Sequence, residues 1–174
     1  LVSRHPGLTI ELQVSDALVD MSRDGIDIAI RTGSTQTEEV IARQIGSHGR
    51  RLYASPAYLK KQGKPKHPDD LARHRIITTS TAPRLNDWPF VIDGKNVVRP
   101  MHGHLRASST AITQEMALAG LGICRVHDLI AAPLVQRGEL IEVLAKFTDQ
   151  QVVPVYAMML PERHRLPKIR ACVD

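Results

Sequence analysis

Short apolar runs of strand character alternate with helix signals along most of this 174-residue chain, and this alternation constrains the fold most strongly. Residues 26–33 form an apolar run, Ser55 and Pro56 begin a helical segment, and a helix expected over residues 108–121 leads into the apolar run 123–126. A regular exchange of strands and helices is typical of a sheet covered by helices. The predicted fold class is therefore α/β.

The first part of the chain predicts one strand-helix-strand unit. Residues 9–14 alternate apolar and polar side chains at period two, which predicts a half-buried strand. Ser15 then predicts the N-cap of a helix that ends at Gly25, and residues 26–33 predict the next strand. We expect these two strands to lie parallel, because a helical crossover joins them.

The rest of the chain continues the pattern, with one hairpin around Asp93 and Gly94. Ser108 or Ser109 predicts the cap of the helix over 108–121, and we expect its buried face to carry Ile112, Met116 and Ala119. The remaining predicted strands are 40–45, 50–55, 76–79, 88–92, 96–100, 102–108, 123–126, 139–144 and 152–160, and the remaining helices begin at 55, 68, 127 and 161.

The charge balance favours an anionic partner only weakly. Lys and Arg number 23 against 18 Asp and Glu, which gives a net charge of +5 spread along the chain. The densest basic run, Lys60, Lys61, Lys64 and Lys66, follows a predicted helix, where cations suit the helix dipole. No aromatic residue is interleaved with it to stack bases. We interpret the run as a solvated surface, with nucleic-acid contact as the alternative.

Compartment signals point to the cytoplasm. No apolar run approaches the roughly 20 residues that a membrane span needs. Cys124 and Cys172 lie far apart and form no CxxC pair, which favours a reducing compartment. The chain begins at Leu1 without a Met, so we expect a fragment of a longer protein, from which a signal peptide or an upstream domain could be missing.

Catalytic and metal signals are weak. The sequence has no G-x-S-x-G elbow, no Cys-His signature and no H-E-x-x-H motif. Gly120 and Gly122 follow a predicted helix, so they indicate a C-cap and a turn, not a phosphate loop. His102 and His104 could face one side of a strand and share a metal, but solvated histidines are favoured. We predict no enzymatic activity, no cofactor and no metal.

Ligand binding is better supported, because polar residues follow several predicted strands. In open α/β sheets the binding cleft lies beyond the carboxyl ends of strands. Ser15, Ser108 and Ser109 offer hydroxyls at helix starts, where a carboxylate is favoured, and Arg31 could clamp it bidentately. Arg125 could add charge. The alternative is that Ser15 and Ser108 are only caps and Arg31 pairs with an acidic residue.

A series of motifs then resembles one known family. DIAIRTG (27–33), RRLYASPAYLKKQGKP (50–65) and PDDLARHRII (68–77) are followed by WPF, MALAGLGICRV, GELIEVL and LPKIRACVD. This order resembles the C-terminal effector-sensing domain of LysR-type transcriptional regulators over nearly the whole chain. ASPAYL and DLARH are its most specific parts.

The resemblance implies a two-lobed fold, like type 2 periplasmic binding proteins, with two crossover strands and a small effector between the lobes. Lobe I would comprise residues 1–76 and 150–174, and lobe II residues 77–149. In similar domains the effector meets loops that match several of the strand-end residues. The predicted ligand-binding residues are Ser15, Arg31, Thr32, Gly33, Thr79, Ser80, Thr81, Ser108, Ser109 and Arg125.

The chain departs from the family pattern in two ways. Similar domains begin with a strand and helix ahead of the segment that matches residues 1–6, and an N-terminal winged helix-turn-helix precedes them; both are absent from this sequence. We therefore expect no operator recognition by this chain alone. His127 also stands where similar sequences often have Pro or a small residue. It could make binding pH-sensitive, or it could be a helix-capping or solvated side chain.

The predicted function is the effector-sensing domain of a LysR-type bacterial transcription factor. It would bind a small metabolite, expected to be a carboxylate, and modulate DNA binding by the missing domain. Similar domains form homodimers through lobe I, using the strand that matches residues 9–14, and no membrane partner is expected. The alternative function is a solute-binding protein of a transport system, which shares the fold.

Overall fold

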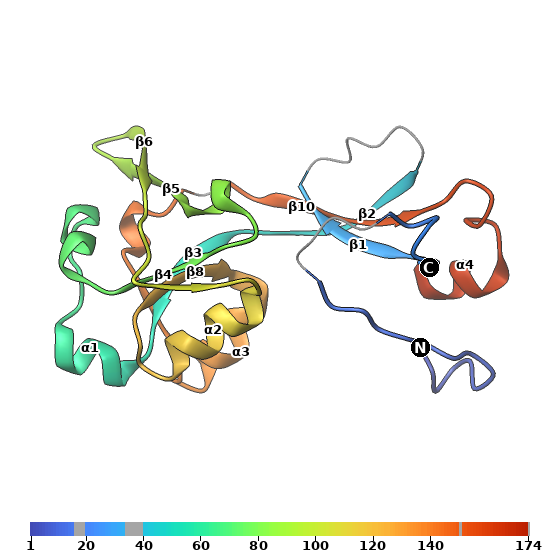
Figure 1. Cartoon of the computed structure of the whole chain (residues 1–174), viewed down its shortest axis with the longest axis horizontal. Coiled ribbons are helices and arrows are strands. Elements are labelled where there is room, and N and C mark those ends of the chain that lie inside the picture. The colour runs from blue at the N-terminus through green and yellow to red at the C-terminus, as the bar shows by residue number, and fades with distance from the viewer. Residues whose placement is uncertain (16–19, 34–39, 150, 174) are drawn as a thin grey trace. The chain divides into compact units, whose positions relative to one another are not determined.

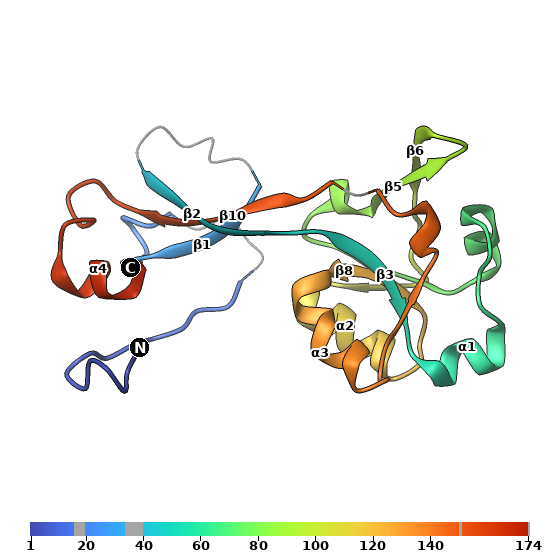
Figure 2. The same cartoon turned by 180° about the vertical axis from the view of Figure 1, so that it is seen from behind.

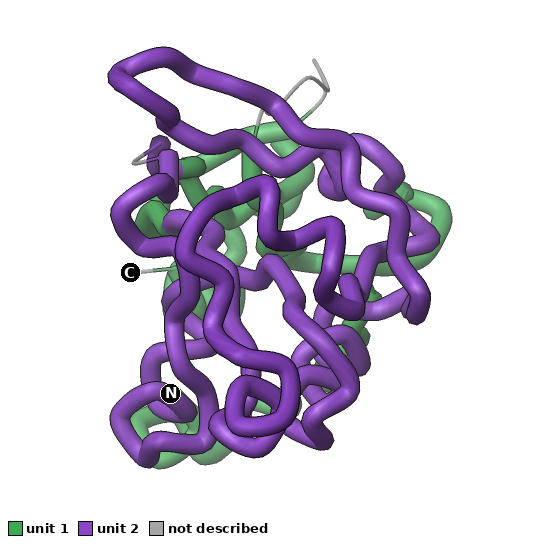
Figure 3. Tube along the Cα trace, turned by 90° about the vertical axis from the view of Figure 1, so that its left-hand side faces the viewer, with its two compact units in different colours: residues 1–48, 153–174 green, residues 49–152 purple. Residues whose placement is uncertain are grey.

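The computed structural model describes all residues except 16–19, 34–39, 150 and 174. The chain forms two compact units: unit 1 contains residues 1–48 and 153–174, and unit 2 contains residues 49–152 (Figure 3). The chain therefore passes between the units twice. The first passage, after His48, differs from the predicted lobe boundary at residue 76, because strand β3 (Arg50–Ala54) is hydrogen-bonded between two strands of unit 2.

Unit 1 is built on a three-stranded antiparallel sheet of order β1-β10-β2. Its strands are β1 (Ala29–Thr32), β10 (Val153–Met159) and β2 (Ile41–His48), and helix α4 (Pro167–Val173) follows β10. The hydrophobic cluster is small, with three buried members: Met21, Ala29 and Met158. Ala157, Met159 and Ile169 of this unit are buried as well.

The predicted strand over residues 9–14 is wrong. These residues belong to no strand, and Leu12 and Val14 are 83% and 90% exposed. An alternating segment forms a strand only where it can pair with a neighbouring strand and pack against a core. In the described part of the chain β1 pairs with β10 alone, so residues 9–14 do not pair with the other edge of β1. The expected parallel pairing of residues 9–14 with residues 26–33 is also wrong, because residues 9–14 form no strand. The helix predicted after Ser15 falls partly on undescribed residues, and residues 21–25 form turns.

Unit 2 contains a mixed five-stranded sheet of order β7-β4-β8-β3-β9. Strand β4 (Ile76–Thr79) lies parallel to both of its neighbours, β7 (Leu105–Ala107) and β8 (Ile123–His127). Strand β3 runs antiparallel to β8 and to β9 (Ile141–Val143). The α/β class predicted from the alternation is thus confirmed, with mixed sheets.

The predicted hairpin is confirmed as strands β5 (Asp87–Ile92) and β6 (Lys95–Pro100). Its turn residues Asp93 and Gly94 both have positive φ angles, 50° and 73°, as a tight two-residue hairpin turn requires. The Ser55 cap is confirmed too, since its Oγ accepts a hydrogen bond from Tyr58 N at 3.3 Å.

The remaining elements are helices of one to three turns. They are α1 (Pro56–Gln62), η1 (Pro68–Arg73), η2 (Pro83–Asn86), α2 (Thr110–Leu118), α3 (Asp128–Gln136) and η3 (Ala145–Phe147). The buried residues of α2 are Thr113 and Ala117, whereas the predicted inner-face residue Ile112 is 50% exposed. Small side chains let α2 lie close to the sheet, so its buried face differs from the face with the largest apolar residues.

Apolar clusters cover both faces of the unit 2 sheet (Figures 1 and 2). Hairpin residues Trp88 and Phe90 pack on one face, called here the hairpin face, and α2 and α3 cover the other. Strand β8 sends Ile123 to the hairpin face and Cys124 to the helical face, as the period of two requires. At its start, a Cβ on Gly122 would lie 2.5 Å from Arg75 O, so only glycine fits there. No helix in the described ranges is long and apolar enough to span a bilayer.

Candidate functional site

The parallel strands of unit 2 end together at one edge of the sheet. Thr79 at the end of β4 lies opposite Ala107 at the end of β7 in the parallel register. The loops that follow carry five predicted site residues, here called the strand-edge cluster: Thr79, Ser80, Thr81, Ser108 and Ser109. The structure therefore brings together five of the six predicted unit 2 site residues, all except Arg125.

Hydrogen bonds tie the two loops of the strand-edge cluster to each other. Ser80 N donates to Ala107 O at 2.8 Å, and Thr81 Oγ1 donates to Ser108 O at 3.2 Å. The hydroxyls of Thr79 and Thr81 also lie 3.2 Å apart. These contacts hold several hydroxyl groups within one small polar region.

Asn86 completes this region, and sequence reasoning missed it. Its Oδ1 accepts from Thr79 N at 3.0 Å and its Nδ2 donates to Thr79 O at 2.9 Å. The side-chain amide thus pairs with the backbone as a further strand would. Asn86 ends the polar stretch before the hairpin, and no pattern there distinguishes a clamping amide from an ordinary loop residue.

Helix α2 begins at this same edge. Ser109 is its N-cap residue, yet the Ser109 side chain makes no capping hydrogen bond. The Ser109 carbonyl instead accepts from the backbone N–H and the hydroxyl of Thr113, both at 3.0 Å. The Ser109 hydroxyl is therefore not used as a cap. The first-turn N–H groups of a helix favour negatively charged groups.

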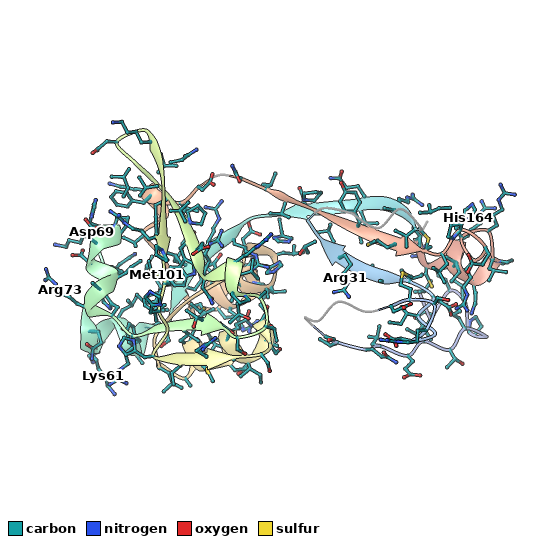
Figure 4. All side chains as sticks on the ribbon, turned by 45° about the horizontal axis from the view of Figure 1, so that its top comes forward. Arg31, Lys61, Asp69, Arg73, Met101 and His164 are labelled. Carbon is teal, nitrogen blue, oxygen red and sulfur yellow. The ribbon has the colours of Figure 1, made fainter. Side chains whose placement is uncertain are left out.

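The predicted residues of unit 1 lie at the end of β1. Arg31 is half-buried opposite Tyr156, and Figure 4 shows its side chain on this strand. Gly33 donates its N–H to Pro154 O at 3.0 Å and has a φ angle of +96°, which favours glycine. Thr32 and Ser15 are exposed. That one ligand contacts these residues together with the strand-edge cluster stays a prediction.

Arg125 lies inside a strand of the unit 2 sheet. It is within β8, not beyond its end, because the strand continues to His127. It lines a recess with residues of β3 and the hairpin, and no member of the strand-edge cluster lines that recess. Burial, together with the nearby charge of Arg50, lowers the pKa of the Arg125 guanidinium to about 10. That Arg125 contacts the same ligand as the strand-edge cluster stays a prediction.

His127 and Asp128 contact the start of β3. Arg50 Nη2 donates to His127 Nε2 at 2.7 Å, which requires the neutral imidazole, because a guanidinium cannot accept. Both carboxylate oxygens of Asp128 accept from Gly49 N, at 3.1 and 3.0 Å, and Asp128 N donates to Gly49 O at 3.1 Å. Sequence reasoning missed this clamp on the first residue of unit 2.

Residues considered for metal or redox chemistry are not assembled into a site. His102 and His104 precede β7 and are exposed. The residues that the structure describes contain no group of three His, Cys, Asp or Glu placed to hold a metal ion. Cys124 is fully buried, which raises the pKa of its thiol to about 12, whereas Cys172 is exposed. The Cys124 thiol therefore stays protonated.

Comparison with known proteins gives a consistent family. A model of the LysR substrate binding domain matches residues 1–174. The chain is 30% identical over 166 residues to an uncharacterized HTH-type transcriptional regulator of Haemophilus influenzae, covering 95% of this chain and 57% of that protein. It is 32% identical over 166 residues to the HTH-type transcriptional regulator YhjC of Escherichia coli, covering 94% and 55%. The chain spans about half the length of the curated relatives it matches.

A solved structure agrees with these relatives. The regulatory domain of CrgA, a LysR-type transcriptional regulator from Neisseria meningitidis, superposes with a TM-score of 0.93 at 27% identity. The match covers 99% of this chain and 84% of that domain. The predicted resemblance and the periplasmic-binding-protein-like fold class are thereby confirmed.

Proposed function

The chain belongs to the LysR substrate-binding domain family, and from this premise we propose that it senses a small metabolite and regulates transcription as part of a longer protein. Domains of this kind bind effectors. The single observation that carries the proposal is the family match over residues 1–174. The relatives are named as transcriptional regulators, which favours this function over the alternative of a transport protein. The same names favour a regulator over an enzyme.

We further propose that the effector carries a carboxylate. In unit 2 it would meet the strand-edge cluster, where hydroxyl groups surround the start of α2. In unit 1 it would meet Ser15, Arg31, Thr32 and Gly33. The uncommitted Ser109 hydroxyl and the first-turn N–H groups of α2 suit a negatively charged oxygen, and an arginine can clamp a carboxylate with two hydrogen bonds.

The proposed mechanism is a shift between conformations. An effector that touches residues of both units binds best to the conformation that offers all of its contacts, so it raises the population of that conformation. If the same change alters the affinity of a DNA-binding domain for its operator, then DNA and effector affect each other's binding by linkage. The chain would supply the sensing half of this coupling and act in the cytoplasm, where the DNA is.

We propose a homodimer through unit 1. Residues 9–14 are not a strand, yet Leu12 and Val14 are 83% and 90% exposed, and so much exposed apolar surface is suited to a partner. Gln13 lies between them in the sequence and donates from its Nε2 to Glu11 Oε1 at 3.4 Å. DNA would be contacted only through a domain outside this sequence.

The test is a screen of small carboxylic acids by thermal shift, followed by titration calorimetry with the best acid. Ser109→Ala and Arg31→Ala should each weaken binding about tenfold or more, because each removes a hydrogen bond to a charged group. Arg73→Ala is the matched control, since Arg73 is an exposed arginine of η1 (Figure 4). It should leave the affinity unchanged. Full affinity in both site variants would contradict the proposed site.

A further inference from the structure

Unit 1 contains a cavity between the edge of its sheet and its last helix. The cavity has a volume of about 510 Å³, which is within the range of about 300–1,000 Å³ that is usual for small-molecule sites. Its lining residues come from β2, from the end of β10, from the turn that follows β10 and from α4. All of them belong to unit 1, so the cavity depends on no contact between the two units.

One part of the lining is apolar. It is called here the apolar floor and consists of Ile41, Met159, Ile169 and Val173. Ile41 and Met159 are cross-strand partners in the pairing of β2 with β10, so their side chains lie on the same face of the sheet. Met159 and Ile169 are 5% and 2% exposed, whereas Ile41 and Val173 are half-buried. An aliphatic chain in the cavity would remove apolar surface from water on both the sheet and the helix, which favours its binding.

The other part of the lining is basic. It consists of Arg43, His164, Arg165 and Arg170, and no Asp or Glu is among the described lining residues. His164 lies in the turn before α4 (Figure 4). The three arginines are exposed, so positive charge lies where the cavity meets solvent. This arrangement complements a ligand with an apolar body and a negatively charged end.

Arg165 is the basic residue best suited to hold that charged end. Arg43 and Arg170 each already interact with another group. His164 Nδ1 donates to the backbone oxygen of Pro161. Arg165 is exposed, and its side chain makes no hydrogen bond or ion pair in the part of the chain that the structure describes. A guanidinium can donate two parallel hydrogen bonds to one carboxylate.

We propose that this cavity binds an aliphatic carboxylate of medium chain length, with its carboxylate on Arg165 and its chain on the apolar floor. The site goes beyond the proposed function, because none of the predicted effector-binding residues lines it. Arg31 and Thr32 lie at the end of β1, opposite Tyr156 and Val155, whereas the cavity contacts the other end of β10, at Met159.

The two strands that line the cavity are also those through which the chain passes between the units. Strand β2 ends at His48, the last residue before the first passage, and β10 begins at Val153, the first residue after the second passage. A ligand that packs on both strands and on α4 stabilises this arrangement of the three elements, because it binds only where they are folded together. The site would thus give the chain a second input besides the proposed effector.

The experiment titrates the chain with octanoate at constant ionic strength and follows the methyl NMR signals of its five methionines. We expect a saturable shift of the Met159 signal, while Met101 and Met116 of unit 2 stay unchanged. Butanoate should bind about tenfold more weakly or less, because a shorter chain buries less apolar surface. Octanamide, which has no charge, should also bind about tenfold more weakly. Equal binding of octanamide and octanoate would overturn the assignment of a carboxylate.

Variants test the assignment to these side chains. Arg165→Gln should weaken octanoate binding about tenfold, because it removes the forked, charged donor from an exposed position where folding is unaffected. Arg4→Gln, at another exposed arginine of unit 1 that does not line the cavity, is the matched control and should bind normally. Ile41→Ala should weaken binding of octanoate more than that of butanoate, because it shortens the apolar floor.

The outcomes are distinct. An unsaturable Met159 shift, or equal octanoate affinities in Arg165→Gln, Arg4→Gln and the unsubstituted chain, would overturn the site. A Met159 shift that follows protein concentration and not octanoate would also overturn it, by showing that a second copy of the chain covers the cavity.

Two further measurements separate this site from the proposed effector site. The best acid from the carboxylate screen should keep its affinity in Arg165→Gln, and octanoate should keep its affinity in Arg31→Ala. Loss of either would overturn the separation of the two sites. If octanoate does not bind while the best acid still does, this site is overturned and the proposed function stays intact.

Discussion

The two units differ in how completely their sheets are covered. In unit 2 the five-stranded sheet has a hydrophobic cluster on each face, built around residues that are almost fully buried, such as Ile123 and Val126. In unit 1 the three-stranded sheet has one small cluster, and Ile30 of β1 remains 58% exposed. Because covering both faces of a sheet buries more apolar surface, the comparison leads us to expect that the unit 2 sheet is the more stable of the two.

Unit 1 compensates in part with polar contacts. Asp27, just before β1, contacts two basic residues near α4: Arg163 at 3.2 Å and Lys168 at 2.7 Å. Exposed ion pairs contribute little, while burying one large aliphatic side chain contributes about 1.5–3 kcal/mol. We therefore expect most of the folding free energy of the described chain to come from unit 2.

Core truncation should give the largest contrast between the units. Leu140 is 1% exposed in the helical-face cluster of unit 2, so Leu140→Ala should lower the free energy of unfolding by about 2–5 kcal/mol. Leu12→Ala, at a residue of unit 1 that is 83% exposed, should change it by less than about 0.5 kcal/mol at concentrations where the chain is monomeric. Urea unfolding followed by circular dichroism measures both. Equal losses would mean that residues 9–14 bury their apolar side chains in solution.

A buried hydrogen-bond network should give an intermediate effect. Tyr58 Oη accepts from Arg75 N at 2.8 Å and lies 3.1 Å from Nδ1 of the buried His74. Tyr58→Phe leaves both partners unsatisfied and should cost about 1–3 kcal/mol. Tyr156→Phe in β10 of unit 1 is the control, because Tyr156 is only half-buried and no hydrogen bond of its hydroxyl is seen in the described structure.

The same urea experiment, read from the fluorescence of Trp88, reports the two tyrosine variants. A loss in Tyr156→Phe as large as that in Tyr58→Phe would show that hydroxyl groups stabilise both units alike. Hydrogen bonding of buried hydroxyl groups would then no longer distinguish unit 2 from unit 1.

Acid should reveal the smallest effect, in unit 1. The hydrogen bond from Lys168, with a second from Arg163, lowers the pKa of the Asp27 carboxyl. The ionised carboxylate therefore stabilises the fold above the unfolded-state pKa of about 3.9, and this contribution disappears as the pH falls through the lower folded-state pKa. Asp27→Asn should lower the free energy of unfolding by less than about 1 kcal/mol at neutral pH. Near a pH of about 2 it should have no effect, because the carboxyl is then protonated.

Urea unfolding at both pH values measures the Asp27 contribution. Glu115→Gln, at an exposed residue of α2, is the control and should change stability at neither pH. A loss in Asp27→Asn that persists unchanged in acid would mean that the contact is not electrostatic.

Local sequence signals predicted the helices, strands and turns of unit 2 well, because these elements pack against neighbouring elements of the same unit. The Ser55 cap, the Asp93-Gly94 turn and the 3₁₀ turn at Pro68 depend on a few adjacent residues, and each is present. The strand at 123–126 was recognised by its apolar run, and Cys124 is buried as its neighbours implied. In such regions local preference and tertiary packing agree.

Features that depend on distant partners were not predictable from the same signals. Residues 9–14 have the right alternation, but a strand also needs a partner along its edge. The contacts of Asn86, Asp128 and Arg50 join residues far apart in the chain or within a loop without pattern. Thr79–Thr81 lie beside Ser108 because β4 pairs with β7, and no local pattern in the sequence could predict that pairing.

Because one thiol is buried and the other exposed, the unaltered protein can be labelled at a single site for a distance measurement by fluorescence. Cys124 is sealed in unit 2, so a thiol-reactive dye would attach selectively at the exposed Cys172 of α4 in unit 1. Trp88, the single tryptophan of the sequence, is fixed in unit 2 and can act as the energy donor. Resonance energy transfer between the two would then report, without any mutation, whether a bound metabolite draws the halves of the molecule together.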